Sequence, residues 1–115
     1  QKVLGFSALK GSGINNVITK FTEKENWKIF DDDIFGGYAK IDSRLVDFMN
    51  EFFKNTGIVL DPIYNSKMVF KITKLIKSDQ WEFGKKILLI NTGGLQSIKE
   101  MNIKLKNKGC DIIKY

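Results

Sequence analysis

Histidine is absent from this sequence, and cysteine, proline and arginine occur once each, as Cys110, Pro62 and Arg44. The absence of histidine removes the commonest general base and the commonest metal ligand. Because only one cysteine is present as well, we expect no zinc site and no other metal centre. A single cysteine also permits no internal disulfide, which fits a reducing, cytoplasmic location.

Long apolar runs are also missing. No run approaches the roughly 20 residues that a membrane-spanning helix needs, so no membrane segment is expected. No charged n-region followed by a long apolar h-region is present either, so we expect no signal peptide. The 115 residues carry a formal net charge of +6, which raises the question of nucleic acid. Lysines are spread over every segment and arginine is nearly absent, so we expect no nucleic-acid partner.

The first third of the chain predicts a strand, a helix and a second strand. Val3 to Leu9 is an apolar run without alternation, which is typical of a parallel strand buried on both faces. Trp27 to Phe30 alternates and predicts another strand, and Asp31 to Asp33 predicts a solvated turn. Between the strands a helix is expected, with one apolar face at i, i+3, i+4 and i+7: Ile14, Val17, Ile18 and Phe21.

The turn Gly11-Ser12-Gly13 joins the first strand to that helix. A glycine turn at a helix N-terminus can bind an anion. Asn16 stands where a dinucleotide fingerprint has its third glycine, and no Gly-Lys-Ser/Thr follows. A tight turn is the simpler interpretation, and a phosphate- or nucleotide-binding α/β domain stays open as an alternative.

Two further helices follow in the middle of the chain. Asp42 or Ser43 caps the first, and Gly57 suits the left-handed position that ends it. Its buried face would contain Leu45, Phe48, Met49, Phe52 and Phe53. The second begins at Asp61-Pro62 and runs to about Lys77, with Val69, Ile72, Leu75 and Ile76 inward and a solvated row of lysines opposite, Lys67, Lys71 and Lys74.

A ligand site is expected where this second helix begins. Tyr64, Asn65 and Ser66 would lie beside main-chain amides that have no partner within the helix. Downstream, Ile87 to Ile90 is the most apolar run and predicts a central parallel strand. Asn91 to Gly94 follows at its carboxyl end, where ligands bind in open α/β sheets. A last helix, Ser97 to Lys108, completes a single α/β layer system.

Three motifs in this chain resemble the C-terminal third of the 1-aminocyclopropane-1-carboxylate deaminase and D-cysteine desulfhydrase family. They are Gly36-Gly37-Tyr38-Ala39-Lys40, Leu60-Asp61-Pro62-Ile63-Tyr64-Asn65-Ser66-Lys67 and Asn91-Thr92-Gly93-Gly94-Leu95. The resemblance extends from Val3 to about Ser97. It implies a parallel-sheet, three-layer α/β fragment of a tryptophan synthase β-like (fold type II) enzyme that uses pyridoxal phosphate.

The resemblance also implies roles for individual residues. Tyr64 resembles the catalytic tyrosine that faces the substrate, and Tyr38 its neighbour. Asn65 stands where the family reaches the cofactor's ring nitrogen, with Glu expected in the deaminases and Ser or Thr in the desulfhydrases. Thr92, which is desulfhydrase-like, would bind the cofactor together with Gly93 and Gly94. Two departures from the family are Asn91 in place of histidine and Ser66 in place of glycine.

The same resemblance bears on the extent of the chain. Residues 1–115 would form the C-terminal part of the large cofactor-binding domain, without its N-terminal part. The Schiff-base lysine and the phosphate-binding loop would precede Gln1, and a phosphate loop supplies much of the anchoring for such a cofactor. The chain is therefore expected to be an inactive fragment of a deaminase or lyase for a small amino acid, a poor cofactor binder, and homodimeric when full-length. The alternative is an interaction module without catalytic activity that docks on a partner chain.

Overall fold

The computed structural model of the protein describes residues 1–9, 11–32 and 35–115, so Asp33 of the expected aspartate turn lies outside the described residues. The secondary structure within these ranges is β1 (Val3–Phe6), α1 (Ile14–Ile18), β2 (Trp27–Phe30), α2 (Ser43–Thr56), α3 (Asn65–Lys77) and α4 (Ser97–Asn107).

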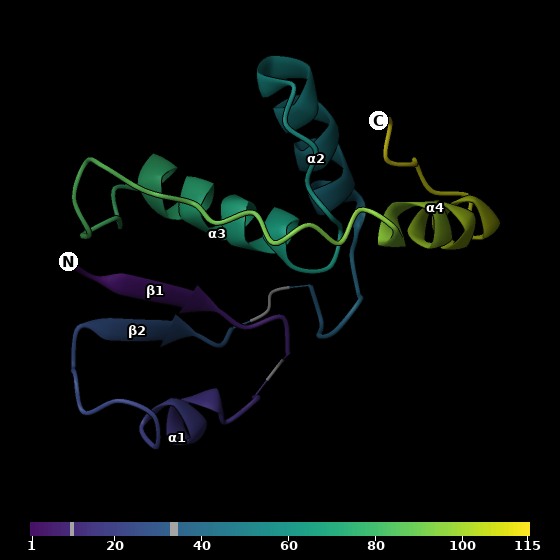
Figure 1. Cartoon of the computed structure of the whole chain (residues 1–115). Helices are drawn as coiled ribbons and strands as arrows, with labels where there is room; N and C mark the ends of the chain where they lie inside the picture. The colour runs from purple at the N-terminus through teal and green to yellow at the C-terminus, as the bar shows by residue number, and fades with distance from the viewer. Residues whose placement is uncertain (10, 33–34) are drawn as a thin grey trace.

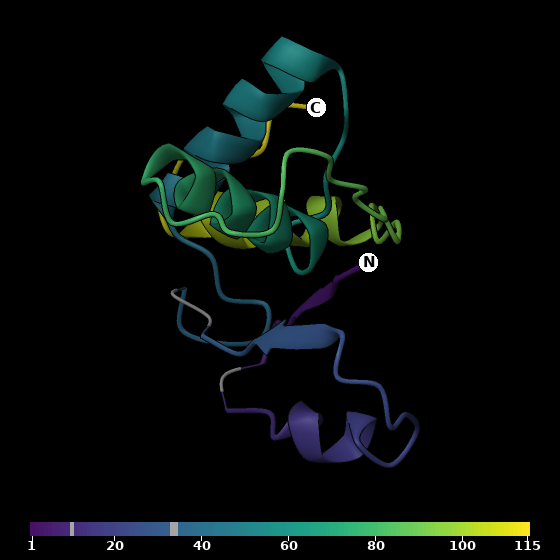
Figure 2. The same cartoon turned by 90° about the vertical axis from the view of Figure 1, so that its left-hand side faces the viewer.

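β1 and β2 form a two-stranded parallel sheet. Val3 is paired with Trp27 and Phe6 with Phe30, and the rings of Phe6 and Phe30 stack with centroids 4.9 Å apart. The sheet lies between α1 on one side and α3 on the other (Figures 1 and 2). The prediction of an α/β chain with parallel strands is therefore confirmed, in a sheet much smaller than expected.

The predicted burial of the N-terminal segment is wrong. β1 ends at Phe6 rather than Leu9, and Val3 and Leu9 are exposed. α1 has five residues, none of them buried, and begins after Gly13 rather than Ser12. The apolar periodicity indicates a face that can be buried, but burial requires an element that covers it.

The helical core lies between α2, α4 and the C-terminal residues. Its buried side chains are Phe35, Leu45, Val46, Met49, Met101, Leu105 and Ile113. Asp42 caps α2 through the N–H of Arg44, and Gly57 ends it with a φ of 71°, so both predicted ends of this helix are confirmed. No helix in the described part of the chain is long and apolar enough to span a membrane.

The predicted central strand is wrong. Ile87 to Ile90 has no strand structure, and Leu88 is 86% exposed. The run belongs to the long connection between α3 and α4 (Figure 1). A strand needs main-chain partners, and within the described ranges the only strand pairing is that of β1 with β2.

Candidate functional site

The first two motifs of the resemblance meet at the N-terminal end of α3. The hydroxyl of Tyr64 donates to that of Tyr38 over 3.4 Å. Lys67 donates from Nζ to the carbonyl oxygen of Gly37 over 2.8 Å. These contacts join residues that are 26 and 30 positions apart in the chain, so the predicted neighbours Tyr38 and Tyr64 do lie together.

The third motif meets the second through Asn65. The side-chain amide of Asn65 donates to the carbonyl oxygen of Gly93 over 3.1 Å. The main-chain N–H of Thr92 donates to Asn65 Oδ1 over 3.3 Å, and the hydroxyl of Thr92 does so over 3.4 Å. All the predicted site residues thus gather around one end of α3, with Gly94 against Asp61.

The carboxylate of Asp61 organises this end of the helix. It is fully buried, and its Oδ1 accepts from the main-chain N–H groups of Ile63 (2.9 Å) and Tyr64 (2.7 Å). Its Oδ2 accepts from the main-chain N–H of Asn65 over 2.8 Å and also from the Asn65 side-chain amide. The expectation that these amides are free for a ligand is therefore wrong, because a carboxylate within the chain occupies them.

The tyrosine pair is the exposed part of the site. Tyr38 is 52% and Tyr64 49% exposed, and their ring centroids are 6.1 Å apart. The hydrogen bond to Tyr38 raises the pKa of the Tyr64 hydroxyl above its ordinary value of 10.0. Tyr64 is therefore protonated at neutral pH, and Tyr38 keeps its own hydroxyl hydrogen for another acceptor.

Replacing Tyr38 by phenylalanine is expected to lower the pKa of Tyr64, because the acceptor that stabilises the protonated hydroxyl is removed. Titration of tyrosinate absorbance in the alkaline range would measure the shift. Burial raises the pKa of Tyr115, so the control variant Tyr115→Phe separates the two signals. A Tyr64 titration that does not move in Tyr38→Phe would contradict the hydroxyl contact.

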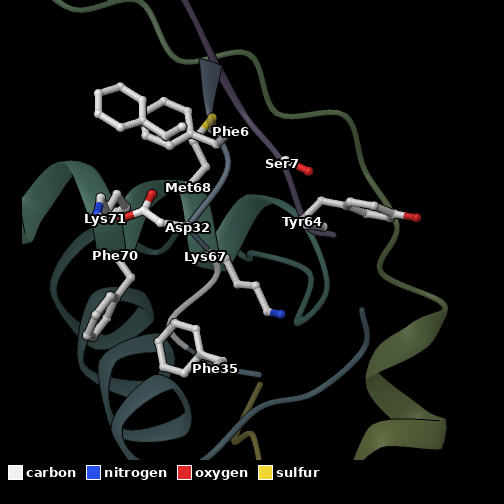
Figure 3. Close-up of a pocket in the computed structure, with 11 residues that line it drawn as sticks. Phe6, Ser7, Asp32, Phe35, Tyr64, Lys67, Met68, Phe70 and Lys71 are labelled. Carbon is white, nitrogen blue, oxygen red and sulfur yellow. Dashed lines mark hydrogen bonds and ion pairs between the residues drawn. The ribbon is translucent and has the colours of Figure 1, made fainter. Parts of the chain in front are cut away.

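Lys67 was missed as a site residue, and its predicted solvated environment is wrong. Its side chain is buried, with 8% of the residue exposed. It lines a cavity of about 30 Å³ together with Phe35 (Figure 3), and its Nζ lies 5.8 Å from the centroid of that ring. The next lysine on this side of α3, Lys71, forms an ion pair with Asp32. These lysines therefore face the segment after β2 and tie α3 to it.

The close approach of the loop Thr92 to Gly94 to Asp61, at the start of α3, depends on Gly94. A Cβ atom at this position would lie 3.2 Å from Cβ and 3.3 Å from Cγ of Asp61, whereas a Cβ atom at Gly93 would meet nothing within 4 Å. Both glycines have a positive φ. Each alanine variant therefore carries backbone strain, and Gly94→Ala adds a steric conflict.

We expect Gly93→Ala to lower the free energy of unfolding by about 1 kcal/mol and Gly94→Ala by about 3 kcal/mol, because overpacking adds to the strain. Urea denaturation followed by circular dichroism would measure both. Equal losses in the two variants would show that the loop does not approach Asp61 as closely as described.

The turn at Gly11-Ser12-Gly13 is already occupied by a carboxylate of the chain itself. The N–H and the hydroxyl of Ser12 donate to Asp31, at distances of 3.0 to 3.4 Å. This arrangement disfavours an anion site at the turn. The described residues also contain no group of three histidine, cysteine, aspartate or glutamate side chains that could hold a metal ion.

Comparison with known proteins shows the same relationship as the motifs. The chain is 41% identical over 61 residues to the mitochondrial bifunctional D-cysteine desulfhydrase/1-aminocyclopropane-1-carboxylate deaminase of Arabidopsis thaliana, covering 51% of the chain and 15% of that protein. It is 30% identical over 105 residues to a putative 1-aminocyclopropane-1-carboxylate deaminase of Pyrococcus horikoshii, covering 87% of the chain and 32% of that protein. No family model and no solved structure matches the chain.

These matches define the class to which this α/β chain is related. The chain is homologous to 1-aminocyclopropane-1-carboxylate deaminase and D-cysteine desulfhydrase proteins. It spans at most about a third of the length of the curated relatives that it matches. The predicted resemblance is therefore confirmed, for a part of those proteins.

The described residues do not fit a complete pyridoxal phosphate site. Both amide hydrogens of Asn65 are bonded within the chain, so none is left for a ring nitrogen. The side-chain polar atom found buried without a partner among the described residues, Ser66 Oγ, lies in a fully buried residue, out of reach of a ligand. The cavity beside Lys67 is also far smaller than the roughly 300 Å³ of a small ligand pocket. No catalytic step at the cofactor follows from these residues.

Proposed function

We propose that the chain is one part of a pyridoxal-phosphate-dependent deaminase or lyase that acts on a small amino acid. The proposal rests on one observation, which is that the three motifs of the resemblance, far apart in the sequence, gather at one end of α3. Homology over a part of two such proteins supports it. In this proposal the chain alone is inactive, and the full-length enzyme is cytoplasmic and homodimeric.

The exposed hydroxyl pair would act on the substrate. Tyr64 is held in its protonated form by the bond to Tyr38, and it would donate its hydroxyl hydrogen to an amino-acid substrate that replaces Tyr38 as the acceptor. Tyr38 would accept from Tyr64 and direct its own hydrogen outward. Both rings are half exposed, which leaves their outer sides accessible.

The loop Thr92 to Gly94 would face the cofactor. Thr92 is exposed, and its hydroxyl makes only a long contact with Asn65. Gly93 has open space around it and no side chain that would obstruct a planar ring, whereas Gly94 leaves room for Asp61. Cofactor binding by Thr92, Gly93 and Gly94 stays a prediction, with Asn65 proposed as the residue that supports the loop.

An absorbance scan after addition of pyridoxal phosphate tests the proposal. It compares this chain with the longest form that its gene encodes, and the urea-unfolded chain controls for aldimines formed on surface lysines. An internal-aldimine band in the long form alone, followed by activity on D-cysteine or aminocyclopropane carboxylate, is the expected result. No band in either form would contradict the proposal.

A second candidate is an interaction module that docks on a partner chain. The observation in its favour is the exposed apolar run from Ile87 to Ile90, because an apolar extended segment without a strand partner invites pairing with another chain. If no aldimine band forms, we expect the lysine variant Leu88→Lys to abolish any self-association seen by analytical ultracentrifugation.

A further inference from the structure

We propose that Asn65 is a positioning residue that joins the first turn of α3 to the loop Thr92 to Gly94, and that its side chain does not donate to the ligand. This role differs from the one that the resemblance implies for this position. It concerns the fold of the chain itself, so it can be tested whether or not the proposed enzyme activity is found.

The contacts of Asn65 leave no hydrogen-bonding group of its side chain unused. The residue is 3% exposed. Nδ2 donates to Asp61 Oδ2 and to the carbonyl oxygen of Gly93. Oδ1 accepts from the N–H and from the hydroxyl of Thr92. A side-chain amide has two donor hydrogens and one acceptor oxygen. In Asn65 each of these is bonded either to Asp61 or to the loop Thr92 to Gly94.

These partners also fix the orientation of the amide. If oxygen and nitrogen exchanged places, the oxygen would face the carboxylate of Asp61 and the carbonyl of Gly93. The NH₂ group would face the N–H of Thr92. Three favourable contacts would become unfavourable at a buried position, which costs free energy at each. The Asn65 amide can therefore adopt only one orientation between Asp61 and the loop Thr92 to Gly94. It acts as a fixed joint between them rather than as an adaptable contact for a ligand.

The same geometry restricts the residue type at position 65. A carboxylate here would stand against the buried carboxylate of Asp61 and against a carbonyl oxygen, so that like charges would meet out of water. Serine is too short to span from Asp61 to Gly93. A neutral amide of the length of asparagine bonds both to Asp61 and to the loop Thr92 to Gly94. The glutamate expected in the deaminases would not fit here, because it is longer and negatively charged.

The other titratable groups near this joint are tyrosines and one lysine. The hydroxyl of Tyr115 interacts with the backbone of Leu60 and with Asp61, Tyr64 precedes Asn65, and Lys67 donates to Gly37. The hydrogen bond to Tyr38 raises the pKa of Tyr64 and burial raises the pKa of Tyr115, so neither tyrosine titrates between pH 4 and pH 8. In an Asn65→Asp variant the new carboxyl would face Asp61, so the pair would take up a proton in that range.

The experiment compares Asn65→Asp with Asn102→Asp by urea denaturation at pH 8 and pH 4.5. Asn102 is a matched control because its amide also donates to a carbonyl and accepts from an N–H, both of Ile113. We expect Asn65→Asp to raise the unfolding equilibrium constant about 100-fold at pH 8 and about 10-fold at pH 4.5. The sign follows because a carboxyl whose folded pKa is raised stabilises the fold below that pKa and loses this contribution as pH rises.

Asn102→Asp is expected to show less than half of this pH dependence, because among the described residues its amide is bonded to the main chain of Ile113 rather than to a carboxylate. The double variant Asp61→Asn/Asn65→Asp exchanges donor and acceptor, and should be about 10-fold more stable than the sum of the single losses. Losses at Asn65 and Asn102 with the same pH dependence, or an Asn65→Glu variant as stable as the wild type at pH 8, would overturn the proposal.

A measurement on the wild-type chain covers the case in which Asn65→Asp does not fold. The side-chain amide hydrogens of Asn65 should exchange with solvent about 100-fold more slowly than those of the exposed Asn91, because they are buried and bonded. Asn91 directly precedes the loop Thr92 to Gly94 and donates to the carbonyl oxygen of Val59 over 3.3 Å. Equal exchange rates for the two side chains would overturn the role given to Asn65.

Discussion

Replacing Asp61 by alanine is expected to lower the free energy of unfolding by about 3 kcal/mol or more, because several buried or part-buried N–H groups lose their acceptor at once. The carboxylate accepts from the main-chain N–H groups of Ile63, Tyr64 and Asn65. It also receives the side-chain amide of Asn65. Given total stabilities of about 5–15 kcal/mol, a loss of this size would remove a large fraction of the stability of the chain.

Urea denaturation followed by circular dichroism would measure the loss, and Asp42→Ala is the matched control. Asp42 also caps a helix, α2, but at the surface and through the N–H of Arg44. Its removal should cost about 1 kcal/mol, the usual value of an exposed N-cap. The comparison isolates what burial and the bond to Asn65 add to an ordinary cap.

The variant Asp61→Asn separates the effect of losing one acceptor oxygen and the negative charge from the effect of losing the side chain, because asparagine has nearly the same shape as aspartate. Asparagine keeps an acceptor for Ile63 and Tyr64 but places an NH₂ group against the donors of Asn65. We expect an intermediate loss, and separation of the Thr92 loop from α3. If Asp61→Ala and Asp42→Ala cost the same, Asp61 is an ordinary cap and the joint between the loops is held by other contacts.

The helices could be predicted from sequence because their signals are local, although α3 begins at Asn65 rather than at the predicted Asp61-Pro62. Asp42 and Gly57 bound α2 through side-chain capping and a left-handed φ, and both effects depend on neighbouring residues only. Met101 and Leu105 lie one turn apart on α4, and both are buried. Their spacing of four residues is a local signal of a buried helix face.

Burial of the strands and of α1 could not be predicted in this way. The apolar runs at Val3 to Leu9 and Ile87 to Ile90 fit buried parallel strands, yet their exposure depends on which segments cover them. A strand obtains its main-chain partners from elsewhere in the chain or from another chain. Periodicity within the run carries no information about that partner.

In the candidate site, too, some features could be predicted from the sequence and others could not. The motifs were sufficient to name Tyr38, Tyr64 and Thr92, and the structure gathers them. The sequence pattern marks Asp61 only as the residue before a helix start, and Lys67 only as part of a solvated row. The spacing of Asp61 and Asn65, four residues apart at a helix start, was the signal for a carboxylate that binds both the helix amides and a side chain.

Under the proposed function, Tyr64→Phe in the longest form that the gene encodes is expected to lower turnover on D-cysteine or aminocyclopropane carboxylate about 100-fold or more, the usual contribution of a positioned proton donor. Cofactor affinity should change less than about 3-fold, because turnover and binding report on different interactions. Single-turnover kinetics and absorbance titration with pyridoxal phosphate would measure the two quantities. Equal losses in both would contradict a substrate-facing role for Tyr64.

Tyr38→Phe is the matched control, since it removes the other half of the same hydroxyl pair. It leaves the Tyr64 hydroxyl in place but without its acceptor, so we expect a smaller loss of turnover, about 10-fold, and a pH profile moved to lower pH with the pKa of Tyr64. Both tyrosines are half exposed, so neither variant should change stability by more than about 0.5 kcal/mol. A larger loss in Tyr38→Phe than in Tyr64→Phe would transfer the proton-donor role to Tyr38, whose hydroxyl hydrogen is the one directed away from the pair.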